Sequence, residues 1–332
     1  MVFKRLLGAM GVGGPSVDTI LDGGAVVPGT TLTGRVMVRG GSMDVEITGI
    51  HLDFVARVEA EGHDSESEGY VVFHRATVGG GFRLAEEQEF SVPFQVPVPW
   101  ETPVTELYGQ PLGIVLGVRT ELAVAGAVDK GDLDQLMIRP LPVQEAVLEA
   151  FGQLGFGFKS ADLELGHIGG TGQTLPFYQE IEMYPPEHYA HAMREIEISL
   201  LASPSGLEVV LEADKPGGFF SGGHDVVNRF VVGHHDVGQT DFNGLVDSWV
   251  RQLAERHGGG HGGGFFGGGH RGHHGHHDPY GHQGHHSHKE EEERSGFGAG
   301  AMVAGVAAGV VGGLVLGEVI DEVGDMFEGD ED

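Results

Sequence analysis

The sequence predicts an all-β protein built from two tandem antiparallel β-sandwiches with short helices, followed by a tail of unusual composition. Two observations support this class. Apolar and polar residues alternate over several segments, which is the pattern of half-buried strands. The length of 332 residues is enough for two domain cores plus appendages. We therefore expect two compact halves and, beyond them, segments that add little to either core.

The first sandwich is expected over residues 1–140. Strands are predicted over 30–38, 45–54, 70–78, 90–98 and 114–128. The alternation slips by one position at Gly49, which indicates a β-bulge in the second of these strands. Pro93 and Pro97 interrupt the segment 90–98, and proline cannot donate a ladder hydrogen bond, so this strand should lie at an edge of its sheet or run extended across the surface.

The pattern changes to helical spacing at Pro142. Apolar residues recur three and four apart from Val143 to Leu154, and Gly155 is a typical helix terminator. We expect a linker helix over residues 141–155 that separates the two sandwiches.

Strand patterns resume in a second sandwich over residues 156–256. Strands are predicted over 161–168, 175–184, 194–201, 207–213 and 226–232. A closing helix over 241–256 places Phe242, Leu245, Trp249 and Leu253 on one face. We expect that face to pack against the second sandwich, with a partner-binding helix as the alternative.

The charge and the cysteine content of the chain exclude some classes of binding partner and site. Residues 1–256 contain 36 acidic and 16 basic residues, so the folded part should repel nucleic acid and anionic lipid. The chain has no cysteine, which excludes disulfides and thiolate metal sites and fits a cytoplasmic protein. We expect protein partners and no nucleic acid.

Several short segments, taken in order, resemble a known family. They are Phe3-Lys4-Arg5-Leu6-Leu7, Ser16-Val17-Asp18-Thr19, Pro28-Gly29-Thr30, Gly34-Arg35-Val36, Pro93-Phe94 and Leu116-Gly117-Val118. Over roughly residues 1–256 the chain is similar to the bacterial sporulation-control proteins of the SpoOM family. This resemblance implies two arrestin-like sandwiches in a regulatory protein linked to sporulation or cell development, which acts through protein contacts and has no established enzymatic activity. It carries no catalytic residues across.

The region 257–294 is rich in histidine and glycine and is predicted to be a disordered linker. It contains eleven histidines. The candidate metal ligands are His270, His273, His274, His276, His277, His285, His286 and His288. Neutral imidazoles at this density bind zinc or nickel. Either the tract is a metal-responsive element, or it is a linker with adventitious metal affinity and no cofactor.

The last region, 295–332, combines an uncharged apolar segment with an acidic terminus. Residues 295–317 are long enough to span a bilayer, and Gly305, Gly309, Gly313 and Gly317 are spaced four apart like a glycine zipper. Membrane association, self-association into a homo-oligomer and disorder remain open alternatives for this segment.

No arrangement of residues in the sequence indicates catalysis. His188 and His191 have Glu187 beside them, but nothing else completes a zinc site. His234-His235-Asp236 follows a strand, where a turn is expected. The sequence therefore predicts a non-enzymatic regulatory or adaptor protein that binds partner proteins through sheet edges and interdomain surfaces. A metal-responsive protein that uses the histidine tract is the alternative.

Overall fold

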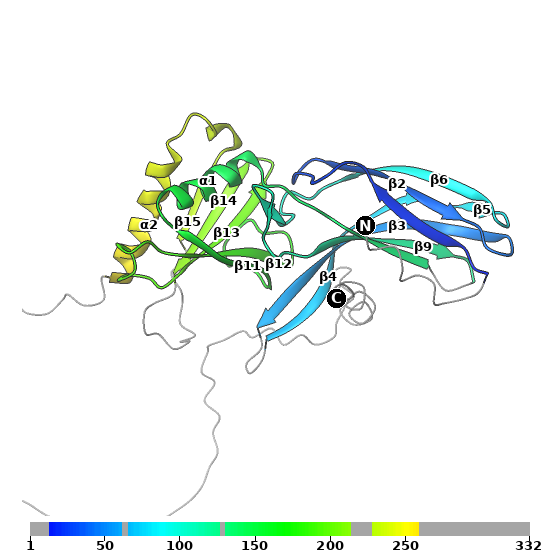
Figure 1. Cartoon of the computed structure of the whole chain (residues 1–332), viewed down its shortest axis with the longest axis horizontal. Coiled ribbons are helices and arrows are strands. Elements are labelled where there is room, and N and C mark those ends of the chain that lie inside the picture. Colours follow the sequence, from blue (N-terminus) through cyan, green and yellow to red (C-terminus); the bar gives the residue numbers. More distant parts are fainter. Residues whose placement is uncertain (1–12, 62–65, 127–129, 214–227, 259–332) are drawn as a thin grey trace, which may run out of the picture. The chain divides into compact units, whose positions relative to one another are not determined.

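The computed structural model describes residues 13–61, 66–126, 130–213 and 228–258 (Figure 1). The strands of its first half are β1 (Ser16–Leu21), β2 (Thr31–Arg39), β3 (Val45–Glu61), β4 (Glu66–Gly79), β5 (Phe82–Leu84), β6 (Glu89–Pro97), β7 (Glu106–Leu107), β8 (Gln110–Pro111), β9 (Leu116–Val124) and β10 (Lys130–Gln135). The second half contains α1 (Pro142–Gln153), β11 (Gly157–Leu165), β12 (Phe177–Tyr184), β13 (Ile196–Ser203), β14 (Gly206–Ala213), β15 (Asn228–Val232), the short 3-10 helix η1 (His234–Asp236) and α2 (Phe242–Gly258). The predicted all-β class with few helices is confirmed.

The first half is a sandwich of two sheets. One has the order β1-β2-β6, and the other contains β10-β9-β3, with β4 and β5 also paired to β3. Side chains alternate as predicted: Val36 and Val38 of β2 face Leu52 and Phe54 of β3 in a core from which solvent is excluded. Burial of these apolar side chains is the main source of stability for this half.

Two local predictions for this sandwich are confirmed. The pairing register between β3 and β9 shifts between Ile47 and Gly49, so the bulge lies where the alternation slips. Strand β6, which carries Pro93, pairs with β2 and ends its sheet, so the missing N–H removes no hydrogen bond from a central ladder.

Helix α1 begins at Pro142, where proline fits because the first helical N–H has no acceptor within the helix. The side chain of Gln144 accepts a hydrogen bond from the Leu141 N–H at 2.9 Å, which satisfies one of the free donors at this end. The helix is followed by Gly155, whose φ of +93° favours glycine. The predicted helix is confirmed, with Val147 and Phe151 fully buried on its inner face.

The second half is a sheet of β11 to β15 with helices as its opposite layer. Each of these strands pairs antiparallel with the next. Its core combines Ile198 and Leu211 of the sheet with Phe151 of α1 and Trp249 and Leu253 of α2. The helical apolar stripes supply the surface that a second sheet would otherwise provide. The closing helix therefore packs against its own half, as expected.

The two halves are joined by a continuous sheet. Glu164 of β11 pairs in parallel with Glu59 of β3, so the larger sheet has ten strands, in the order β10-β9-β3-β11-β12-β13-β14-β15 with β4 and β5 beside β3. The Glu101 carboxylate also accepts hydrogen bonds from the backbone N–H groups of Thr174 at 2.8 Å and Leu175 at 3.1 Å. These long-range contacts hold the loop before β12.

Other predictions were less exact or are left open. Strands β1, β5, β7, β8 and β10 had not been predicted, and β9 ends at Val124, before the predicted limit of residue 128. The domain boundaries at residues 140, 155 and 256 stay predictions. The regions 257–294 and 295–332, apart from the end of α2, lie outside the described residues.

Candidate functional site

The histidines singled out in the sequence fall into three groups. One group, His188 and His191, lies in the connection between β12 and β13. His270, His273, His274, His276, His277, His285, His286 and His288 all lie outside the described residues. His234 and His235 lie in η1, where a turn was expected. The Nε2 atom of His234 is 2.8 Å from the Ser203 carbonyl oxygen, and its ring packs on Trp100. This arrangement gives His234 a structural role beside β13.

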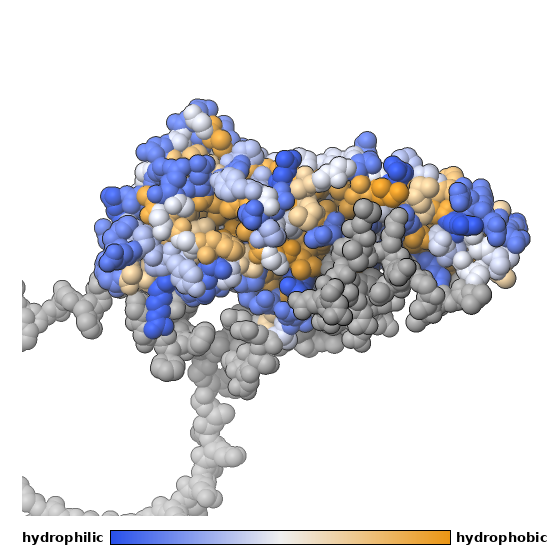
Figure 2. Space-filling view, viewed as in Figure 1, coloured by the Kyte–Doolittle hydropathy of each residue, from blue (hydrophilic) through white to orange (hydrophobic). Residues whose placement is uncertain are grey.

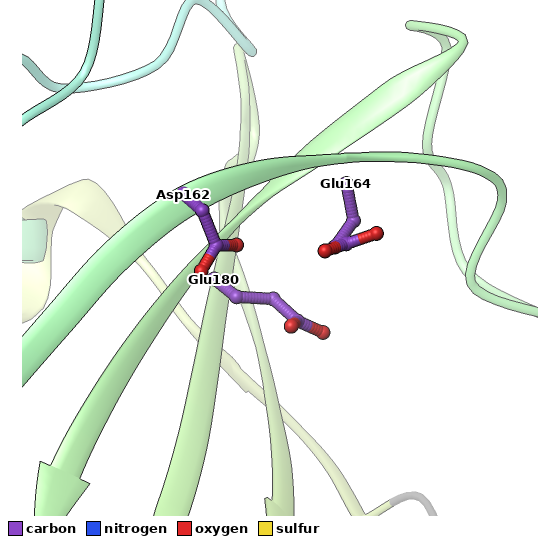
Figure 3. A group of neighbouring side chains, drawn as sticks. All are labelled: Asp162, Glu164 and Glu180. Carbon is purple, nitrogen blue, oxygen red and sulfur yellow. The ribbon is translucent and has the colours of Figure 1, made fainter. Parts of the chain in front are cut away.

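Among the described residues, three potential ligand side chains gather on β11 and β12 (Figure 3). Asp162, Glu164 and Glu180 each place a carboxylate oxygen within 4.8 Å of the others. Asp162 lies directly opposite Glu180 in the strand pairing. Leu163 and Ile181, which follow Asp162 and Glu180 along their strands, point into the cores, so the three acids share the opposite face of the sheet.

The acidic cluster, defined as these three residues, holds a proton at neutral pH. Burial, followed by the charges of Glu197 and Asp162, raises the pKa of Glu180 to about 9. Burial, followed by the charge of Glu59, raises the pKa of Asp162 to about 6. Like charges at this separation cannot all ionise without a cost, so Glu180 is protonated at pH 7.

Lys159 lowers the pKa of Asp162, but burial and the charges of Glu59 and Glu182 outweigh its effect. Lys159, two residues after the start of β11, forms ion pairs with Glu182 and Glu195. Carboxylate oxygens are the ligands that hard cations prefer, but acidic groups commonly gather without a cation. At neutral pH the cluster contains a protonated Glu180 beside Asp162 and Glu164. One part of the acidic cluster is visible in the sequence, where two acids flank a leucine in β11. The residue of β12 that faces these acids depends on the strand register, which the sequence pattern does not give.

The larger sheet ends at β15, and no strand among the described residues pairs with the outer edge of β15. The side chain of Val231 in this strand is 77% exposed. In the described part of the chain, the other exposed large apolar residues are Met43, Phe90, Tyr108, Phe158, Tyr184 and Val237. Figure 2 shows hydrophobic residues interspersed with hydrophilic ones on one face of the molecule. Val231 has the highest exposed fraction in this group and lies on the end strand of the larger sheet, whereas Phe90, on the end strand β6 of the smaller sheet, is 42% exposed.

Comparisons with known proteins decide the family. The family model described as SpoOM protein matches residues 3–217. The chain belongs to the SpoOM family. It is 34% identical over 214 residues to the sporulation-control protein spo0M of Bacillus subtilis (strain 168), an alignment that covers 64% of this chain and 80% of the relative. The resemblance found in the sequence is thus confirmed.

A solved structure supports the same assignment. The crystal structure of Spo0M, sporulation control protein, from Bacillus subtilis matches with a TM-score of 0.64 and 29% sequence identity, covering 73% of this chain and all of that one. SpoOM family membership supports a regulatory role. None of the helices in the described part of the chain is both long and apolar enough to cross a membrane.

Proposed function

We propose that this SpoOM family member is a non-enzymatic regulator of sporulation that acts by binding a partner protein at the edge of β15. The observation that carries the proposal is the exposed Val231 on the terminal strand of the larger sheet. An edge strand presents backbone N–H and C=O groups in register for an added strand, and an exposed β-branched residue can pack against that strand.

Neighbouring contacts keep β15 in place for such pairing. Arg229 lies 3.5 Å from Glu208 of β14, and the ring of Phe230 stacks on Trp249 of α2 with ring centroids 4.7 Å apart. These contacts hold the strand from the sheet side and from the helix side. A preorganised edge loses little conformational entropy when a partner strand binds.

Affinity capture with matched baits tests the proposal. The full chain, its Val231→Lys variant and its Val237→Lys variant are used as baits in lysates of sporulating cells of the source organism. Val237 is 37% exposed and lies outside the strands, so it controls for an added surface charge. We expect at least one protein to be captured by the wild type and by Val237→Lys and lost with Val231→Lys. Retention of every captured protein by Val231→Lys would refute the edge as the binding site.

A second candidate function is metal response through the histidine tract, which rests on the eleven histidines of residues 257–288. Zinc or nickel is titrated against the full chain and against a chain that ends at residue 258. This proposal expects metal to change the assembly or partner capture of the full chain alone. Equal behaviour of both chains would leave only adventitious metal affinity.

We also propose a cytoplasmic location, with residues 295–317 as the element that could add membrane association or self-association. Cell fractionation and sedimentation of the full chain and of a chain lacking residues 295–317 separate these alternatives. Membrane recovery that requires the segment supports association. If both chains are recovered equally in the cytosol and both sediment with the mass of the same oligomeric state, the segment serves only as a linker.

A further inference from the structure

Strands β1 and β10 meet at one side of the first sandwich, where the two sheets approach each other. Each is the end strand of its sheet. On β10 the positions that face inward hold Asp132 and Asp134, which lie opposite Thr120 and Val118, both fully buried, in the pairing with β9. Two inward carboxyl groups at adjacent inward positions are unusual, because such positions normally hold apolar side chains.

Hydrogen bonds connect this pair to β1. The backbone N–H of Thr19 donates to Oδ2 of Asp132 at 2.7 Å, and the hydroxyl of Thr19 lies 2.6 Å from that of Thr120. We call this set of contacts the β1–β10 seam. It links the two sheets through polar groups, so its strength depends on the protonation of the carboxyl pair.

Asp132 and Asp134 lie two residues apart on β10, so their carboxyl groups lie next to each other on the inward side of the strand. Two ionised carboxylates at neighbouring inward positions repel each other, which favours one proton on the pair. The Oδ2 atom of Asp134 is buried and has no hydrogen-bond partner, which further disfavours its charged form. Adjacency and burial therefore both favour one proton on the carboxyl pair at the seam.

The nearest acidic residue of β1 acts in the same direction. Asp18 adds a negative charge that raises the pKa of both aspartates. Lys130, two residues before Asp132, is the basic residue of β10. Burial, followed by the charge of Asp132, raises the pKa of Asp134 to about 7. The stored proton is thus released close to neutral pH.

We propose that the β1–β10 seam is a pH-sensitive latch, in which loss of the proton shared by Asp132 and Asp134 weakens the attachment of β1 to the rest of the sandwich. Below neutral pH the pair carries a single negative charge and the seam is closed. Above neutral pH two adjacent carboxylates and Asp18 repel one another, and β1 opens more often. When β1 opens, β2 loses the strand that covers its edge.

The expected change in the frequency of β1 opening with pH follows from proton linkage. When β1 opens, Asp134 regains the low pKa of an exposed aspartate, so the open form gives up its proton more readily than the closed form. Opening therefore becomes more frequent as pH rises toward the pKa of the closed form. A shift to about 7 corresponds to roughly a tenfold increase in opening between pH 6 and pH 8. Because the carboxyl pair is partly exposed and therefore partly screened by solvent, we expect the opening of β1 to increase about threefold to tenfold over this pH range.

Backbone hydrogen exchange of the full chain tests the latch, with rates corrected for the intrinsic effect of pH. In the wild type, protection of the β1 amides should fall several-fold from pH 6 to pH 8, while the amides of α1 serve as an internal reference. Asp134→Asn keeps a donor toward Asp132 and cannot ionise, so it should retain the high protection at pH 8. Asp162→Asn, which removes a different buried carboxyl, should leave the pH dependence of β1 unchanged.

Two results would overturn the latch. One is constant β1 protection in the wild type between pH 6 and pH 8, which decides the matter even if Asp134→Asn does not fold. The other is a full pH dependence in a folded Asp134→Asn variant. Neither result bears on partner binding at β15, so the latch and the proposed function can fail separately.

Discussion

The Nη2 atom of Arg119 donates a hydrogen bond to Oδ2 of Asp53 at 2.6 Å, and the Asp53 side chain is fully buried between neighbouring strands of the larger sheet. Arg75 approaches the other carboxylate oxygen at 3.4 Å and pairs with Glu121 at 2.7 Å. A buried charge with two basic partners is retained only if both stay in place, so the group is a sensitive point of the first sandwich.

Asp53→Ala should lower the free energy of unfolding by about 3–5 kcal/mol, because it leaves Arg119, whose side chain is only 20% exposed, without its carboxylate. Urea unfolding measures the change. Asp22→Ala is the matched control, since Asp22 and Arg35 are both about half exposed and lie 3.8 Å apart. It should cost less than about 1 kcal/mol. Equal costs for the two variants would contradict the assignment of Asp53 as a buried ion-pair centre.

Gly34 of β2 should not tolerate a side chain. A Cβ atom there would lie 2.5 Å from the carbonyl oxygen of Ile20 and 2.6 Å from the ring of Phe94. We expect Gly34→Ala to lower the melting temperature through a loss of ~1–3 kcal/mol. Gly24→Ala, at a site with no atom within 4 Å, should leave stability almost unchanged. An unchanged melting temperature in the Gly34→Ala variant would show that β1 and β6 do not pack against β2 as closely as described.

The acidic cluster should make stability fall as pH rises. Glu180 keeps its proton in the folded chain up to about pH 9, whereas the unfolded chain releases it near the ordinary glutamate pKa. Unfolding is therefore favoured progressively between about pH 5 and pH 9. Glu180→Gln should remove this loss and become more stable than the wild type by a few kcal/mol at pH 9. Urea unfolding across this range is the measurement, with the exposed Glu86→Gln as control.

The turn between β7 and β8 contains Tyr108 at a φ of +51°, followed by Gly109 at +74°. Both values are typical of a type I′ turn, which favours asparagine and glycine. Because the Tyr108 side chain is 60% exposed, Tyr108→Asn should stabilise the protein by up to ~1 kcal/mol. Gly109→Ala should have the opposite effect. Thermal unfolding of the two variants gives the comparison, and destabilisation by Tyr108→Asn would indicate contacts of the tyrosine ring that outweigh the strain.

Local signals in the sequence were sufficient for much of the fold. Alternating apolar residues located β2 and β3, the phase slip located the bulge at Gly49, and the spacing from Val143 to Leu154 located α1. Strand β10 was missed because its inward positions hold Asp132 and Asp134, which reverse the usual pattern. The strand whose polar and apolar positions depart from the usual alternation is thus also the strand on which we place the latch.

Long-range relationships were beyond the reach of these signals. The parallel pairing of Glu164 with Glu59 joins segments that are far apart in the sequence, and no short motif indicates it. The acidic cluster was missed for a related reason, since Asp162 meets Glu180 only through the register of β11 and β12. The exposed edge at β15 likewise follows from strand order, which alternation cannot provide.

The central claim, that the chain regulates by binding a partner at β15, is tested most directly by hydrogen exchange of the chain with and without a purified partner obtained by the capture experiment. We predict that the amides of Asn228–Val232 gain protection when the partner binds, and that Val231→Lys abolishes the gain. Unchanged exchange across β15, with new protection confined to another element, would contradict the claim.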